Sequence, residues 1–243
     1  MQPWGSANHC AMLRRGYLEL LGITDPKLFN PVEFMLKRYA GPHIVALSSR
    51  DADATYNDLR SRVDYVTPPR DLGRMAAYGA DGNEMRRVAF KLVGFERERI
   101  PEARIQFTQH LTPDEMWQPW LLDHANGTVA LTTAHIVSAD PGASAARLMQ
   151  ALGVRPEPLG SGSCRLLLRD SAIVLHTRDD WEAKTGRPLD KPLPAVAGIG
   201  LEVAALDATA AFLDKAGIET VRAGATLRVP AHVACGAELI FEQ

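Results

Sequence analysis

Glu19 is the residue whose setting most suggests chemistry. It is the only acidic residue within the apolar run 17–21, and it lies in phase with Tyr17 and Leu21 of a predicted strand. An ionised carboxylate in such a run needs a partner, because burying an unpaired charge is costly. A metal ion, an arginine or backbone N–H groups would each serve. Glu19 is therefore a candidate metal ligand, with a purely structural role as the alternative.

Two histidines could join Glu19 in a metal site. His43 opens a predicted strand over residues 42–49, and His110 ends a predicted strand over residues 103–110. Two imidazoles and one carboxylate suit divalent transition metals and leave coordination positions open to a substrate. The alternatives are that His43 is an ordinary residue at a strand end, and that His110 orders the loop at Thr112 through backbone hydrogen bonds.

The elements that would position these residues repeat along the chain. Three segments read as strands, namely 42–49, 133–138 and 198–204. Each is followed by a predicted helix, and these helices begin near Asp51, Asp140 and Asp207 respectively. The last two helices end at a glycine, which is common at helix C-termini. The predicted strands that follow the three helices are 86–95, 103–110, 163–168, 171–178, 220–227 and 234–242.

A shorter pattern precedes these units. Residues 9–14 and 16–22 read as two strands of a hairpin. The chain thus consists of one incomplete module and three modules with a strand, a helix and further strands. Residues 156–163 are predicted as a turn inside the third module, and residues 187–194 as the link to the fourth. An unrelated α+β fold is the alternative.

Three motifs resemble proteins of the glyoxalase-like branch of the vicinal oxygen chelate superfamily, which also includes bleomycin-resistance proteins and extradiol dioxygenases. The first is GSANH at 5–9 followed by GYLELL at 16–21. The second is QHLTP at 109–113 with Trp117 and HANG at 124–127. The third is the ending ACGAELIF at 234–241. Together with the repeats, these motifs cover nearly all of the chain.

The resemblance implies an α+β fold in which repeated βαβββ modules form open, cup-like mixed sheets. Paired modules would make two domains, with an N-terminally incomplete first pair at 1–127 and a second pair at 128–243. Each cup would hold a ligand or one divalent metal ion such as Mn, Fe, Ni or Zn. Glu19 falls on the carboxylate position of the family motif. His43 lies eight residues before Asp51 where the family has seven, so it fits only with a longer turn.

The same alignment predicts no metal in the third and fourth modules. Thr133 and Gly200 stand at the positions of the histidine ligands, and Leu239 stands at the carboxylate position. A one-residue slip in register would place Glu238 there instead. His135 shares a strand face with Thr133 and stays an alternative ligand. His124 and Asn126, beside Gly127, are predicted to serve a turn.

Two functions follow, and whether the protein is an enzyme is left open. The first is a metal-dependent lyase, isomerase or dioxygenase acting on a small substrate with vicinal oxygens. The second is a metal-free protein that binds or sequesters a small molecule. In that case Tyr17, Phe107 and Trp117, together with Trp120, would line the pocket, although aromatic residues more often belong to the core.

Composition excludes several other classes. The chain has 243 residues, 27 of them basic and 29 acidic, and the net charge of −2 argues against a nucleic-acid partner. Cys10, Cys164 and Cys235 lie far apart, which favours free thiols over a disulfide framework or a zinc site. The N-terminus lacks a signal-peptide pattern, and no apolar run reaches membrane-spanning length. We expect a cytoplasmic protein without a membrane partner.

The incomplete first module predicts self-association. A truncated module leaves an unpaired strand edge and apolar surface beside residues 9–22. We therefore expect a homodimer or a larger oligomer, which light scattering over a wide concentration range would detect. A monomer at every concentration would contradict this expectation.

Overall fold

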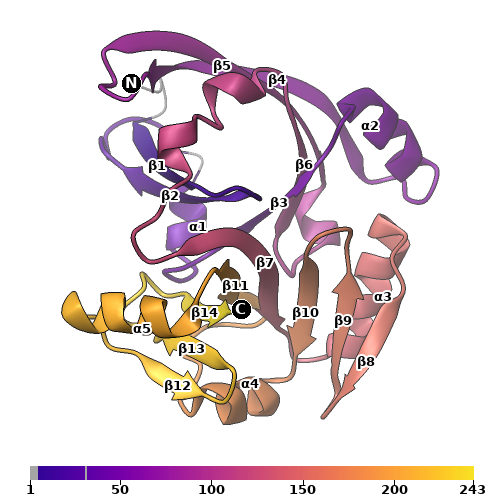
Figure 1. Ribbon diagram of the computed structural model, residues 1–243. Helices are drawn as coiled ribbons and strands as arrows, with labels where there is room; N and C mark the ends of the chain where they lie inside the picture. The colour runs from indigo at the N-terminus through magenta and orange to yellow at the C-terminus, as the bar shows by residue number, and fades with distance from the viewer. Residues whose placement is uncertain (1–4, 31) are drawn as a thin grey trace.

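The computed structural model describes residues 5–30 and 32–243, and its strands form three sheets (Figure 1). Residues 1–4, at which the signal-peptide pattern was sought, lie outside the described residues. Among those described, no helix combines the length and apolar character that crossing a membrane requires.

The first sheet is a hairpin. Strands β1 (Ser6–Met12) and β2 (Tyr17–Ile23) pair antiparallel, with Cys10 opposite Glu19. Both strands were predicted, with boundaries shifted by one to three residues. A short helix α1 (Glu33–Leu36) follows. Beyond the hairpin, Arg15 forms an isolated parallel bridge to Ala130, which ties the hairpin turn to the second half of the chain.

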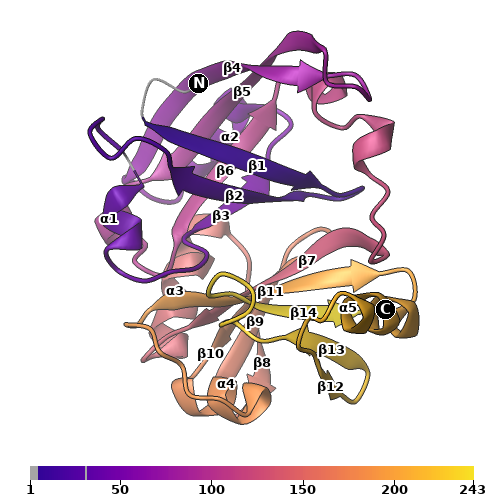
Figure 2. The ribbon, with the colours of Figure 1, turned by 90° about the vertical axis from the view of Figure 1, so that its left-hand side faces the viewer.

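The second module forms a four-stranded sheet of order β3-β6-β5-β4, with β3 exposed at one edge. Helix α2 begins at an N-cap that Asp51 provides, because its carboxylate accepts bonds from the N–H groups of Asp53 and Ala54. The elements are β3 (Ile44–Ser48), α2 (Ala52–Arg60), β4 (Val66–Tyr78), β5 (Glu84–Phe95), the short 3₁₀ helix η1 (Arg97–Arg99) and β6 (Arg104–His110). In Figure 2 the hairpin lies across this sheet.

The last two modules share one eight-stranded sheet of order β12-β13-β14-β11-β7-β10-β9-β8. The 3₁₀ helices η2 (Pro113–Glu115) and η3 (Pro119–Leu121) lead into it. The third module is β7 (Thr128–Val137), α3 (Pro141–Leu152), β8 (Pro156–Gly160), β9 (Ser163–Leu167) and β10 (Ala172–His176). After α4 (Arg178–Thr185), the fourth is β11 (Ala195–Val203), α5 (Leu206–Lys215), β12 (Val221–Ala223), β13 (Thr226–Val229) and β14 (Glu238–Glu242).

The predicted α+β class and the cup-like mixed sheets are confirmed. Asp140 caps α3, which ends at Gly153 in the left-handed conformation with φ 72°. Asp207 lies in the first turn of α5 and not at its cap, which is Ala205. Helices α2 and α3 pack on one side of their sheets in a core with Leu59, Val93, Leu148 and other apolar residues.

Several elements differ from the sequence prediction. Helix α1 was not predicted, and the single predicted strand 220–227 is divided into β12 and β13. Residues 156–160 form strand β8 and not a turn, and β4 was missed altogether. Both are edge strands with prolines, Pro156 and Pro158 in one and Pro68 and Pro69 in the other. Proline cannot donate to a sheet ladder and is tolerated at edges, so an edge strand of this kind resembles a loop in sequence. Helix α4 was also missed, although Thr177 caps it and Gly186 ends it.

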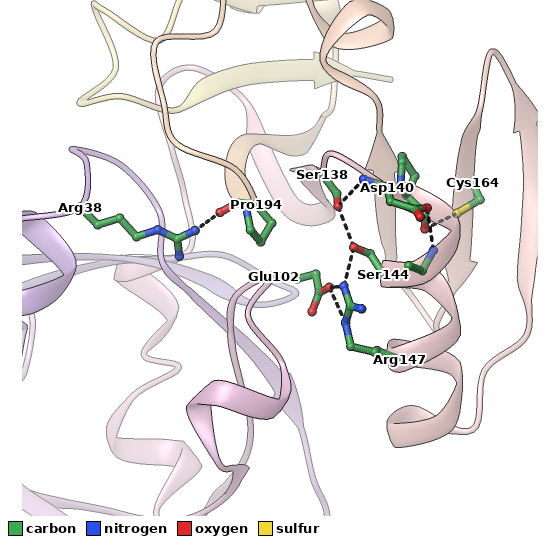
Figure 3. Close-up of polar contacts among 10 residues, drawn as sticks. Arg38, Glu102, Ser138, Asp140, Ser144, Arg147, Cys164 and Pro194 are labelled. Carbon is green, nitrogen blue, oxygen red and sulfur yellow. Dashed lines mark hydrogen bonds and ion pairs between the residues drawn. The ribbon is translucent and has the colours of Figure 1, made fainter.

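The two halves of the chain share one hydrophobic core. Val93 of β5 and Ile105 of β6 pack in the same cluster as Leu148 of α3 and Leu166 of β9. Polar contacts between the two halves reinforce this packing, as Figure 3 shows. Arg147 of α3 donates two hydrogen bonds to Glu102, whose side chain is fully buried. Arg38 donates to the carbonyl oxygen of Pro194 across the same boundary.

The ion pair between Glu102 and Arg147 supports a prediction about stability. Arg147→Met leaves the buried carboxylate of Glu102 without its cation. We expect the free energy of unfolding to fall by about 3 kcal/mol, since removing one partner of a buried pair strands a charge. Urea denaturation monitored by circular dichroism measures the change.

The matched control is Arg222→Met. Arg222 pairs with Asp207 on the surface, where both side chains are exposed, and exposed pairs contribute less than about 1 kcal/mol. If the two variants lost equal free energy of unfolding, the ion pair between Glu102 and Arg147 would contribute no more than an ordinary surface pair.

Candidate functional site

The first cup lies between the hairpin and the four-stranded sheet. Cys10 and Met12 of the hairpin face Arg74, Ala76 and Val88 of the sheet across a cavity of about 110 Å³. Alternation along the hairpin puts Tyr17 and Glu19 on the same face as Cys10 and Met12. The predicted ligand Glu19 therefore lies on the side of the hairpin that faces the cup, although its side chain is exposed.

Three rings gather at one end of this cup. The ring of His110 is 4.8 Å from that of Trp117 and 5.9 Å from that of Tyr17, edge-on in both cases. The Tyr17 hydroxyl lies 3.5 Å from Nε2 of His110. Trp117 donates its indole N–H to the carbonyl oxygen of Leu13. Tyr17 and Trp117, predicted to share a pocket, are thus neighbours.

Glu19 acts electrostatically on this group. Burial, and then the negative charge of Glu19, raise the pKa of the Cys10 thiol to about 11. The same two causes raise the pKa of Tyr17 to about 12. The side chain of Asn8 donates to the Glu19 carboxylate. Two of the predicted ligands, Glu19 and His110, therefore both lie close to Tyr17.

His43 lies elsewhere. Its ring stacks on Tyr39 with centroids 3.9 Å apart, and its Nε2 is 3.0 Å from the carbonyl oxygen of Tyr39. Strands β3 and β6 run parallel with Ile44 beside Arg104, so His43 and His110 stand at opposite ends of the pair. At about 3.3 Å per residue they are roughly 20 Å apart.

The three predicted ligands therefore do not converge on one ion, since metal–ligand bonds to nitrogen and oxygen are close to 2 Å. Across residues 5–30 and 32–243, no three His, Cys, Asp or Glu side chains gather closely enough to hold a metal. The described residues therefore do not form a metal centre with three protein ligands.

Other predicted site residues have structural contacts. Phe107, predicted to line a pocket, packs in the shared core against Phe95 on the face of β6 away from the hairpin. His124 lies 2.6 Å from the carbonyl oxygen of Met12, and Asn126 accepts a bond from the N–H of Thr128. Trp120 packs edge-on against Tyr78.

The second cup is the larger cavity, about 310 Å³, on the face of the eight-stranded sheet away from α3 and α5. Its apolar wall comes from strands β8, β9, β10 and β14, and its polar groups come from β7, β9, β10, α4 and β14. The apolar residues are Leu159, Leu167, Ala172, Val174 and Ile240, and the polar ones include Thr133, His135, Arg165, His176, Lys184 and Glu242.

Two glycines of β11 allow close packing on this face of the sheet. A Cβ at Gly200 would lie 2.7 Å from Oγ1 of Thr132, and one at Gly198 would lie 2.6 Å from the indole of Trp181. Both distances are well below van der Waals contact, so a side chain at either position would clash. Gly198 thus lets α4 place Trp181 on this face of the sheet, where it packs against Val137 and Ile240.

A chain of hydrogen bonds runs from the wall of the cup into α4. Nδ1 of His135 is 3.0 Å from Nε2 of His176, and Nδ1 of His176 is 2.8 Å from the carboxylate of Asp180. Ser163 donates its hydroxyl to the same carboxylate oxygen at 2.6 Å. His135 is 8% exposed and His176 is 5% exposed, so both imidazoles are buried and held in fixed orientations.

Burial keeps the two imidazoles of this hydrogen-bonded series uncharged. Burial, then the proximity of His176 and Lys184, lower the pKa of His135 to about 3. Burial also lowers the pKa of His176, although Asp180 opposes the shift. Burial acts to raise the pKa of Asp180, but hydrogen bonds from Ser163 and His176 outweigh it and lower that pKa. At neutral pH both imidazoles are neutral and Asp180 is ionised.

Sequence reasoning found only part of this cup. Thr133 and Gly200, predicted at the ligand positions of the third and fourth modules, do line the cavity. Leu239 and Glu238 do not line it. Leu239 packs in the core beside α5, and Glu238 is buried against Arg228, so Glu242 is the carboxylate of β14 that reaches the cup. His176 and Asp180 were missed.

Comparison with protein families identifies the family of this chain. Residues 1–153 match the family model described as a glyoxalase-like domain. The chain belongs to the glyoxalase-like family. The sequence motifs had indicated the same glyoxalase-like family. A comparison with curated protein sequences gave no match.

Several solved structures resemble this chain at low sequence identity. A hypothetical protein from Staphylococcus aureus superposes with a TM-score of 0.69 at 14% identity, covering 99% of this chain and 86% of the other. Methylmalonyl-CoA epimerase from Mycobacterium tuberculosis gives 0.39 at 21%, covering 50% and 93%. The Mn(II)-bound glyoxalase from Novosphingobium aromaticivorans gives 0.48 at 13%, covering 82% and 62%. The first likeness concerns the fold alone, and the other two carry no functional argument.

Proposed function

We propose that this glyoxalase-like protein binds a small, largely apolar molecule in the second cup. The observation that carries the proposal is the cavity of about 310 Å³ with the buried imidazole of His135 in its wall. A cavity that combines apolar walls with fixed polar groups is typical of small-molecule sites.

Size and lining narrow the ligand. The cavity has the volume of about ten water molecules, which suits a single ring with one or two substituents. Leu167, Val174 and Ile240 offer apolar contact, while His135 and Thr133 offer hydrogen bonds. Planar aromatic compounds with a polar substituent fit this combination.

Filling the cup tests the proposal. Ala172 lines the second cavity, so Ala172→Phe should occupy the space and weaken binding of the probe 4-nitrophenol at least about tenfold, equivalent to about 1.4 kcal/mol. Isothermal titration calorimetry measures the affinity. Quenching of tryptophan fluorescence provides a second readout, because Trp181 lies beside His135 and His176.

The matched control makes the same substitution in the other cup. Ala76 lines the first cavity, and Ala76→Phe should leave the affinity unchanged. Loss of binding in Ala76→Phe alone would move the ligand to the first cup. Unchanged binding in both variants would contradict a site in either cavity.

Metal-dependent chemistry in the first cup is the second candidate. It is favoured by the position of Glu19, on the face of the hairpin that faces this cup and close to the ring cluster around His110. Two donors are fewer than a resident ion needs, so a bound substrate would have to supply the remaining oxygen ligands.

Metal analysis of the purified protein tests this candidate. If the protein holds a stoichiometric divalent ion, we expect Glu19→Gln to abolish binding while the fold is retained, because the amide keeps the shape and loses the charge. Glu242→Gln, which changes the carboxylate of the second cup, is the control and should retain the metal. Metal retained in Glu19→Gln and lost in Glu242→Gln would place the ion in the second cup.

Self-association also stays a proposal. Strand β3 is an edge of its sheet, and within the described residues the hairpin forms a separate two-stranded sheet. These edges support the dimer expected from the sequence.

A further inference from the structure

Three arginines gather on one side of the four-stranded sheet. They are Arg70 of β4, Arg97 of η1 and Arg104 of β6, and we call them the arginine cluster. Within residues 5–30 and 32–243, none of the three forms an ion pair or donates a side-chain hydrogen bond. Arg104 is half-buried, whereas Arg70 and Arg97 are exposed.

The strand register places two of these arginines on the face of the sheet that carries the first cup. Arg70 pairs with Leu92 of β5, and Leu92 pairs with Thr108 of β6, so these three side chains share a face. Alternation along β6 puts Arg104 on the same face as Thr108. Phe107 points the opposite way, into the shared core. Arg70 and Arg104 therefore lie on the face that the hairpin crosses.

The strip of sheet between these two arginines leaves room for a ligand. Gly94 of β5 pairs with Gln106 of β6, and their row lies midway between the rows of the two arginines. A Cβ at Gly94 would meet only ordinary contacts, the nearest at 3.6 Å. The amide of Gln106 is half-buried and forms no hydrogen bond to another described residue. It can therefore donate to an oxygen held among the arginines.

Arg97 joins the cluster from the segment that follows β5. Its guanidinium lies over the ring of Phe34 of α1, 3.6 Å from the centroid. This cation–π contact holds the guanidinium in place and leaves its charge unneutralised. Burial, then the positive charges of Arg70 and Arg97, lower the pKa of Arg104. The three guanidiniums are thus close enough to repel one another.

This arrangement is costly without an anion. Like charges repel, and burial has removed part of the hydration of Arg104. Glu96 and Glu98 flank Arg97 in the sequence, but in the part of the chain that the structure describes neither forms an ion pair with the cluster. A bound anion would offset the repulsion that these side chains leave uncompensated.

We propose that the arginine cluster, together with Gln106, binds a doubly charged phosphate group. Guanidinium forks match phosphate oxygens and can bind them in pairs. A phosphate monoester carries a charge of about −1.5 to −2 at neutral pH and offers three acceptor oxygens. A carboxylate offers less charge and fewer oxygens, so phosphate compensates three cations better.

The phosphate site is separate from the small-molecule site proposed above. None of its residues lines the second cup, so the two proposals can be tested independently. The net charge of −2 for the whole chain favours a small phosphate compound over a nucleic acid. The source of the group is either free phosphate or a phosphate ester, and both share the same chemistry at the arginines.

Calorimetric titration tests the phosphate site. The probes are inorganic phosphate and phenyl phosphate, each in a buffer free of phosphate and sulfate at constant ionic strength. We expect the unsubstituted protein to bind at least one probe saturably. Arg104→Met should weaken that binding at least about tenfold, because it removes the half-buried cation of the cluster.

Arg87→Met is the matched control. Arg87 is exposed on β5 and pairs with Met75 of β4, which places it on the face of the sheet away from the hairpin. This substitution removes the same charge and should leave the affinity unchanged. Equal losses in Arg104→Met and Arg87→Met would reveal nonspecific attraction by net charge and would overturn the proposal. Absence of saturable binding of both probes would overturn it as well.

Arg70→Met covers the case in which Arg104→Met fails to fold, because Arg70 is exposed on an edge strand. It should also weaken binding, and the probe should then raise the midpoint of thermal unfolding less than in the unsubstituted protein. An unchanged affinity in Arg70→Met would contradict the site. Tighter binding of phenyl phosphate than of inorganic phosphate would assign the site to a phosphate ester, and the reverse order would assign it to the free ion.

Discussion

The pairing of strand β7 on both of its edges is the constraint on which the rest of the structure depends. Its parallel contact with β10 closes the third module, and its antiparallel contact with β11 joins the third module to the fourth. The turn of the hairpin also bridges to Ala130 of the same strand. Because Ile136 and Val137 are fully buried, β7 also contributes to the cores on both faces of the sheet.

The register of β7 positions the second cup. This register pairs His135 with Val174 of β10 and with Gly198 of β11. His176 lies two residues beyond Val174 on β10, so its side chain is on the same face of the sheet as that of Val174. The absence of a side chain at Gly198 admits Trp181, and with it the helix that carries Asp180 and Lys184. A change of one residue in this register would turn His135 to the opposite face, toward α3.

Much of the fold could be predicted because local signals agree with it. Aspartates near the helix N-termini and the glycines after α3 and α5 are readable in sequence, and so is the alternation of the hairpin strands. Strands β4 and β8 could not be read in this way. Their prolines are tolerated only because each strand lies at a sheet edge, and edge position is a property of the assembled sheet.

The candidate site could be predicted only where its residues are close in sequence or matched a motif. Glu19 and Tyr17 could be placed on one face of the hairpin because that face follows from the alternation of side chains along a strand. His43 and His110 were grouped by residue type, and their separation depends on the direction of two parallel strands. His135 and His176 are 41 residues apart and meet only through the pairing of β7 with β10, which no local pattern reveals.

The shared hydrophobic core couples the two halves thermodynamically. With Val93 and Ile105 packed against Leu148 and Leu166, neither half can expose its side of this cluster without exposing the other. Global unfolding therefore involves both halves, and a ligand bound in the second cup would stabilise the first half as well. At a hundredfold excess over its dissociation constant the stabilisation is about 2.7 kcal/mol. It would appear as slower amide hydrogen exchange in β5 and β6, far from the bound molecule.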